Sequence, residues 1–412
     1  MTTLDVPGSA ATRPRRTLSR RAAFWTAAAV TAICLWTSAA PTTTYPLYAS
    51  TWHLTPTATT AIFAIYPVAL VGFLLIFGQL SDYIGRRATM LYGVGAMLAG
   101  ALLFAVAPSV GWVYAGRALM GAGVGMAQTA ATAAAVEFSP PGKSARASSI
   151  TAAAQAVGLA MATIVGGGLI QYAPEPLHLD FWVLLAVMAV VFAAVWQLPR
   201  HTKDESQGRW RPRPITVARG IRVLYVASAI AVGAAYALGS VFLALGPEIV
   251  RDLVGTGNIF VIGLLIAIFS AASAVTAIVG RRFPASRLVP VGGVLTLVDL
   301  GLLDLSASMH SLPLFVATTV VGGTAWGLLF SGGLGLITTH APADHRGGTV
   351  AAVYLVAFLF QGAFALTLGL VATASGLSTA LLIGVIVIGT LALLVIAAAV
   401  VLATRPRSRD DN

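Results

Sequence analysis

Charged residues and cysteines are scarce in this sequence, and each shortage excludes a class of protein. Asp, Glu, Lys and Arg make up only 9% of its 412 residues, whereas soluble domains carry about 25%, so an ordinary water-soluble enzyme is excluded. The lone cysteine, Cys34, excludes an internal disulfide framework and a cysteine-based metal cluster. His340 and His345 flank a short loop without further metal ligands. We therefore expect no metal and no cofactor.

Apolar residues are what the sequence has in abundance. They account for 58% of the chain, and the mean hydropathy is +0.87. A helix needs about 20 apolar residues to cross a bilayer, and twelve such stretches recur between polar or Pro/Gly-rich breaks. They are residues 22–46, 57–80, 88–107, 110–137, 146–171, 181–198, 222–247, 257–279, 288–306, 312–339, 348–373 and 377–402. The sequence predicts an all-α membrane protein with twelve transmembrane helices.

One charged, proline-bearing segment, residues 199–221, interrupts this pattern halfway along the chain. It predicts a linker between two six-helix bundles, residues 22–198 and 222–403, with short tails at 1–21 and 404–412. Ser19, Arg20 and Arg21 resemble a twin-arginine export signal. Because the apolar run that follows is longer than a signal-peptide core, we expect an uncleaved first helix.

The basic residues behind the formal charge of +11 indicate the orientation of the chain in the membrane. If the N-terminus is cytoplasmic, every Lys and Arg except Arg117 and Arg251 falls in a cytoplasmic tail, loop or linker. Positive residues mark the cytoplasmic side of membrane proteins. We therefore predict a multi-pass protein of the inner (plasma) membrane with both termini cytoplasmic, and no nucleic-acid partner.

Catalytic and nucleotide-binding motifs are missing from the apolar helices and their loops. There is no GxxxxGK[ST] phosphate loop, which argues against ATP-driven transport. The glycines between Gly121 and Gly125 lie inside an apolar helix with no strand before them, so they do not form a dinucleotide loop. No Ser, His and Asp set gathers on one membrane face. The sequence therefore predicts that the protein is not an enzyme.

The two halves carry a weak internal repeat. The basic pair Arg86-Arg87 after the second predicted helix recurs as Arg281-Arg282 after the eighth, and the glycines at 121–125 have counterparts at 322–327. Duplicated halves with a site at the midplane between them are typical of secondary transporters.

Two motifs resemble signatures of the major facilitator superfamily. The segment from Gly78 to Arg87, GQLSDYIGRR, is similar to its G-x-x-x-D-R-x-G-R-R loop, with Tyr83 in place of the usual basic residue. The stretch from Arg117 to Gly123, RALMGAG, resembles its helix 4 signature. The resemblance covers essentially residues 20–403 and is nearest to drug and metabolite efflux members. It implies two pseudo-symmetric six-helix bundles.

The same resemblance implies that the loop after the second helix ties helix ends together during gating. The residues independently suit this role, since glycines permit a tight turn and a carboxylate accepts strong bonds from arginine. The alternative is simple membrane anchoring by a basic loop. The gating candidates are Gly78, Asp82, Gly85, Arg86, Arg87 and Glu137.

Two charged residues lie within predicted helices and are candidates for ion coupling. Arg117 is about five residues from the outer end of its helix, where an unpaired charge is costly, so it faces the interior or snorkels to the outer surface. Asp299 lies near the midplane and either carries a proton or has a structural role on a peripheral helix.

A layer of amides and aromatics is expected near the midplane. Such groups suit a neutral or amphipathic organic substrate, although interhelical packing explains each of them singly as well. The cavity candidates are Trp36, Gln128, Gln155, Tyr236, Trp326 and Gln361.

The predicted function follows from these features. Gly158, Gly166 and Gly167 partly match a glycine signature of drug–proton antiporters, with Ala162-Thr163 replacing its Gly-Pro, and helix packing explains these glycines equally well. We predict a secondary transporter that exports a small organic molecule by proton antiport with alternating access. The alternative is an uptake permease or facilitator for a small polar metabolite such as a sugar or organic acid. The expected partners are this small-molecule substrate, protons and the lipid bilayer, and the protein is expected to be a monomer.

Overall fold

The computed structural model describes residues 18–140, 144–199, 221–255, 257–341 and 346–404. The predicted linker 199–221 and the two predicted tails fall largely outside these residues. Within them the chain is helical without strands, and twelve segments are long and apolar enough to cross a membrane. The predicted all-α, twelve-helix architecture is confirmed.

The N-terminal half begins with a composite first span made of α1 (Arg20–Ala39), the 3₁₀ helix η1 (Ala40–Thr44) and α2 (Tyr45–Thr51). The other elements of this half are α3 (Pro56–Phe77), the short α4 (Leu80–Ile84), α5 (Arg86–Ala105), α6 (Val110–Phe138), α7 (Ser144–Tyr172) and α8 (Leu179–Trp196).

The C-terminal half begins with a second composite span, made of α9 (Arg222–Ser240), the π-helical η4 (Val241–Leu245), α10 (Gly246–Glu248) and the π-helical η5 (Ile249–Val254). It continues with α11 (Ile259–Gly280), α12 (Ala285–Ser308), α13 (Leu312–His340), α14 (Arg346–Ser375) and α15 (Leu377–Thr404).

The ends predicted for the first and seventh spans, at Pro46 and Pro247, are wrong. These spans continue to Thr51 and Arg251. Each proline lies in the first turn of the next helical piece, where its missing N–H would have no helical partner and its fixed φ suits the helix. Proline therefore changes the type of helix in both spans but does not end it.

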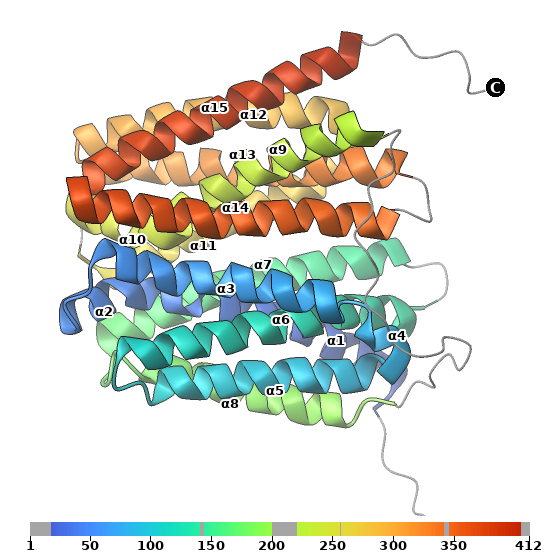
Figure 1. The fold of residues 1–412 in the computed structure, drawn as a ribbon. Helices are drawn as coiled ribbons and strands as arrows, with labels where there is room; N and C mark the ends of the chain where they lie inside the picture. The colour runs from blue at the N-terminus through green and yellow to red at the C-terminus, as the bar shows by residue number, and fades with distance from the viewer. Residues whose placement is uncertain (1–17, 141–143, 200–220, 256, 342–345, 405–412) are drawn as a thin grey trace, which may run out of the picture.

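The helices run side by side between two faces (Figure 1). We call the face with the start of α1, α4 and the end of α15 the terminal face, and the face with α2 and α10 the distal face. Within the N-terminal half, α5 packs against α6 and α8, and α3 against α6; within the C-terminal half, α12 packs against α13 and α15. Between the halves, α3 packs against α14 and α7 against α11.

Small residues set the spacing of these helices. A Cβ atom on Gly100 of α5 would lie 2.7 Å from the carbonyl oxygen of Gly116 and 2.8 Å from Met120 Cγ of α6. Gly72 of α3, in contrast, has no neighbouring atom within 4 Å of where its Cβ would be. Close backbone approach through glycine is a main source of helix association in membranes.

We predict that Gly100→Ala destabilises the protein whereas Gly72→Ala does not. Alanine improves intrinsic helix stability by about 0.5–1 kcal/mol at either position. At Gly100 this gain is outweighed by overpacking, which typically costs 1–3 kcal/mol. The measurement is thermal unfolding of both purified variants in one detergent. Equal melting temperatures would show that α5 and α6 can separate without cost.

Candidate functional site

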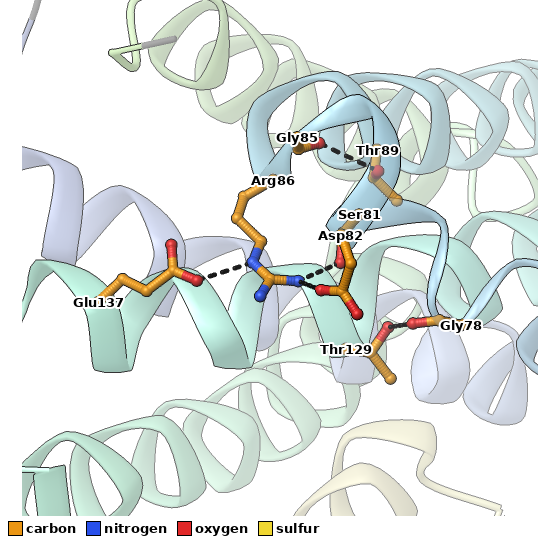
Figure 2. Close-up of polar contacts among 8 residues, drawn as sticks. All are labelled: Gly78, Ser81, Asp82, Gly85, Arg86, Thr89, Thr129 and Glu137. Carbon is orange, nitrogen blue, oxygen red and sulfur yellow. Dashed lines mark hydrogen bonds and ion pairs between the residues drawn. The ribbon is translucent and has the colours of Figure 1, made fainter. Parts of the chain in front are cut away.

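Arg86 is the centre of a cluster at the terminal face, made of Ser81, Asp82, Arg86 and Glu137 (Figure 2). Its Nη1 donates to Asp82 Oδ1 at 2.5 Å and to Ser81 Oγ, and its Nε donates to Glu137 Oε1 at 2.9 Å. Charge-assisted bonds of this kind are among the strongest in proteins. The Arg86 cluster thus joins α4 and the start of α5 to the end of α6.

The two predicted glycines shape the loop of this cluster. Gly85 has φ +88°, which side chains with a Cβ rarely adopt, and its carbonyl accepts from Thr89 Oγ1 at 3.2 Å. The carbonyl of Gly78 accepts from Thr129 Oγ1 of α6 at 3.0 Å. The sharp reversal between α4 and α5 brings Asp82 and Arg86 together.

Two arginines differ from the sequence-based expectation. Arg87 lies with its Cζ 5.7 Å from the ring centre of Trp196 on α8, away from the Arg86 cluster. Arg20, which the sequence analysis did not connect with the gating loop, donates from α1 to the carbonyls of Glu137, Phe138 and Ser139 at 2.7–3.2 Å. Cations stabilise the carbonyl end of a helix, so α6 ends between two arginines.

Arg117 is completely buried and faces the interior of the N-terminal half, not the outer surface. It donates from Nε to Ile62 O at 3.1 Å, from Nη1 to Ser38 O at 3.0 Å, and from Nη2 to the hydroxyl of Tyr45 at 3.1 Å. Its Cζ also lies 4.7 Å from the ring centre of Tyr66. Neutral acceptors therefore hold this charge.

Pro41 explains why carbonyls of α1 are available to Arg117. In an α-helix the N–H of residue 41 would bond to the carbonyl of Thr37, and in a 3₁₀ helix to that of Ser38. Proline has no N–H, and Arg117 Nη1 donates to both carbonyls, at 3.5 and 3.0 Å. The carbonyls at the break in the first span thus gain a donor, and the buried guanidinium gains acceptors.

Asp180 is a buried carboxyl that the sequence analysis missed, because it lies directly before the predicted span 181–198 and inside the observed α8. It is 1% exposed, and neither of its oxygens has a hydrogen-bond partner among the described residues. Burying an ionised carboxylate costs several kcal/mol, whereas a helix N-terminus such as that of α8 returns about 2 kcal/mol at most. The neutral acid is therefore favoured here.

Asp299, the predicted coupling carboxyl, lies between α12 and α13. It is fully buried, and its oxygens also lack a hydrogen-bond partner among the described residues. Both oxygens lie 2.9 Å from where a Cβ of Gly322 would be, so the carboxyl packs against the backbone of the neighbouring helix.

Aromatic side chains from three helices form a cluster in the C-terminal half. Tyr236 of α9 contacts Phe358 of α14 with ring centres 4.8 Å apart, and Trp326 stacks on Phe330 of α13, also at 4.8 Å. The ring centres of Tyr354 and Phe358 are 6.0 Å apart. We call these five residues the aromatic cluster. Spacing of four residues within α13 and α14 is the sequence signal that could have revealed Phe330, Tyr354 and Phe358.

The six predicted cavity residues do not all meet. Tyr236 and Trp326 have ring centres 6.0 Å apart. Trp36 Nε1 and Gln128 Oε1 are buried without a hydrogen-bond partner in the described part of the chain. Gln155 and Gln361 are half-buried on α7 and α14.

The two halves are hydrogen-bonded to each other near the distal face. The hydroxyls of Thr57 on α3 and Thr373 on α14 are 2.7 Å apart, and Thr57 Oγ1 also donates to Gly369 O at 3.2 Å. On the other side, the backbone N–H of Ile259 donates to Gln171 Oε1 at 2.9 Å. We call these contacts the distal seam. At the terminal face, Arg281 Nη1 donates to Ser149 Oγ at 2.9 Å.

We predict that Arg86→Ala and Asp82→Asn each loosen the terminal end of the N-terminal half. The side chains of Asp82 and Glu137 are 38% and 35% exposed, so solvent screening limits the loss to about 1 kcal/mol. Arg282→Ala is the matched control, because it removes the same charge from an exposed position in the C-terminal half. The measurement is thermal unfolding together with the labelling rate of a cysteine placed at Thr129. Equal labelling in all three variants would contradict a tying role for the cluster.

Comparisons with known proteins agree with this architecture. Residues 25–356 match the family model of the Major Facilitator Superfamily. Comparison with curated proteins finds no relative that matches the sequence. A bacterial homologue of the human lysosomal transporter Spinster, in an inward-facing and unoccupied conformation, superposes with a TM-score of 0.73 at 14% identity, covering 96% of this chain and 100% of that one.

Two further solved structures have the same fold. The nucleoside transporter NupG has a TM-score of 0.74 at 13% identity, covering 92% of this chain and 100% of that chain. A peptide transporter POT in complex with sulfate has a TM-score of 0.71 at 16% identity, covering 93% of each chain. The chain belongs to the Major Facilitator Superfamily and is a multi-pass membrane transporter, not an enzyme.

Proposed function

We propose that this transporter exports a small organic molecule by proton antiport, with the terminal face in the cytoplasm of a cell whose plasma membrane it spans. The observation that carries the substrate class is the aromatic cluster, whose rings on α9, α13 and α14 are mutually in contact. Aromatic faces bind planar and cationic organic groups through stacking and cation–π attraction. The orientation rests on the basic residues of the terminal face.

Alternating access is supported by the chemistry of the distal seam. It consists of hydroxyl and amide hydrogen bonds and close backbone contacts, so it can open without separating buried ion pairs. Net hydrogen-bond contributions of about 0.5–1.5 kcal/mol each match the few kcal/mol that separate interconverting states. In this proposal the structure has its distal side closed, and the Arg86 cluster holds α4, α5 and α6 together as one unit of the N-terminal half.

The orphaned polar atoms of Trp36 and Gln128 favour the second candidate, uptake or facilitated movement of a small polar metabolite. A buried indole N–H and amide oxygen without partners are ready to bind the hydroxyl or carboxyl groups of such a substrate. Direction of transport distinguishes the two candidates.

The test of export uses the full-length protein in proteoliposomes with ethidium as a planar aromatic cation. An imposed pH gradient should drive dye toward the more acidic side, because the protons leave that side as the dye enters it. Tyr236→Ala and Trp326→Ala should reduce the rate at least tenfold, because both rings lose their partners, whereas Tyr92→Ala on the exposed surface of α5 should not. Accumulation of a sugar or organic acid with no dye flux would favour the uptake candidate.

We predict that a disulfide between Thr57→Cys and Thr373→Cys blocks transport reversibly. Sulfur atoms there would take the places of hydroxyls 2.7 Å apart, and a covalent bond would prevent the seam from opening. The variants are made with Cys34→Ala, and a protease site within residues 200–220 reveals the link by keeping the cleaved halves together. Thr57→Cys alone is the control.

Reductant should restore dye flux in the double variant and leave the control unchanged. Full transport by the cross-linked protein would show that the distal seam does not open during the cycle.

A further inference from the structure

We propose that Asp180 is a proton-binding site that exchanges its proton with the distal side when the distal seam opens. This deepens the proposed proton antiport and rests on it only for the role of the site in transport. Asp180 is 1% exposed, and both carboxylate oxygens lack a hydrogen-bond partner among the described residues. A carboxyl in this state is favoured as the neutral acid, which needs no counter-charge.

The surroundings of Asp180 are polar but uncharged. On α7, a Cβ at Gly166 would lie 3.1 Å from Asp180 Oδ2 and 2.9 Å from Thr43 Oγ1, so the carboxyl and the threonine of η1 converge on a bare stretch of backbone. Tyr48 of α2 is 1% exposed, and its hydroxyl also lacks a partner within the described chain. Hydroxyls can donate to a carboxylate or accept from a carboxylic acid, so hydroxyl groups suit both protonation states of Asp180.

In the described structure no cationic side chain is hydrogen-bonded to the carboxyl of Asp180. Arg117 of α6 is held by backbone carbonyls and Tyr45, and His178, just before α8, faces Glu175 at 3.7 Å. α11, which packs against η1 and α7, has no ionisable residue between Ile259 and Gly280. On α7 the ionisable residues are Arg146 and Tyr172 at its two ends, and Tyr172 is 70% exposed.

The position of Asp180 explains why exchange would occur from the distal side. It lies in the first turn of α8, directly after the loop whose Glu175 is 78% exposed. Tyr48 stacks on Trp52 at the distal end of the first span, with ring centres 4.6 Å apart. When water enters here, the O–H bond of the acid breaks, the proton passes to water, and the entering water solvates the carboxylate that remains.

Distal opening would also uncover the shell of the carboxyl. Gly166 and Thr43 belong to α7 and η1, and both elements pack against α11 of the other half. Gly167, the next residue of α7, would place a Cβ 2.9 Å from Ile259 O, beside the seam bond between Gln171 and Ile259. Separation of α7 from α11 would therefore let water approach the groups around Asp180.

The test is an infrared titration of the full-length protein in lipid bilayers, without any transport substrate. The carbonyl stretch of a buried carboxylic acid should be present in acid and disappear as the bath becomes alkaline. Asp180→Asn should lose this titrating band, and Asp180→Glu should retain one at a shifted frequency. Asp299→Asn is the matched control, because it removes the other buried unpartnered carboxyl, and the band should persist. The same titrating band in Asp180→Asn would overturn the proposal.

Two further arms complete the experiment. Exchange of choline chloride for sodium chloride should leave the wild-type band unchanged. A band that sodium removes in wild type but not in Asp180→Glu would overturn the proposal in favour of a metal-cation site. In the cross-linked Thr57→Cys/Thr373→Cys protein the band should no longer respond to alkali, and reductant should restore the response. Because no arm measures transport, absent dye export with an intact titration would count against the proposed function alone.

Discussion

Inside a bilayer each backbone N–H and C=O must find a partner within the protein, and the rest of this structure is arranged around the places where the first span cannot meet that demand. Pro41 lacks the N–H that would bond to the carbonyl of Thr37 in an α-helix or to that of Ser38 in a 3₁₀ helix. Arg117 donates to both carbonyls from α6. Burying an unpaired charge and leaving helix carbonyls unsatisfied would each be unfavourable alone. The hydrogen bonds between Arg117 and these carbonyls reduce both costs.

This pairing fixes the residues that follow. The guanidinium of Arg117 also binds the Tyr45 hydroxyl and lies on the ring of Tyr66, so it positions the start of α2 and one face of α3. A conformational change that moved α9 away from α3 would leave Arg117 satisfied, since its hydrogen bonds lie within one half. Rigid halves with a changeable boundary are what alternating access requires.

The sequence predicted features that depend on local pattern and missed those that depend on distant contacts. Twelve spans could be counted because length and apolarity suffice, and the joining of Asp82 to Arg86 follows from four residues in one loop. The ends at Pro46 and Pro247 were misplaced because a proline at a helix start resembles a helix stop. Asp180, Tyr48 and Arg20 could not be singled out, since their significance arises from neighbours more than 100 residues away in the chain or from burial. For example, Arg20 meets Phe138 across 118 positions.

Two pairs of identical residues show that the environment of a side chain, not its type, decides its role. Arg86 and Arg117 are both bonded arginines, yet Arg86 has carboxylate partners at a partly exposed face, and Arg117 has neutral partners in the core. The exposed cluster can therefore break and re-form at small cost, whereas loss of Arg117 would leave carbonyls of α1 unsatisfied in the membrane.

The two buried carboxyls without a hydrogen-bond partner in the described structure differ in the same way. Asp299 packs on the backbone of α13, within one half and far in the chain from the seam residues, so opening of the halves need not change its surroundings. Asp180 shares its shell with η1 and α7, which touch the other half. A group whose solvation changes between two conformations exchanges protons differently in them, and conversely protonation shifts the balance of those conformations. Of these two carboxyls, Asp180 is the one whose shell would become exposed to water when the halves separate.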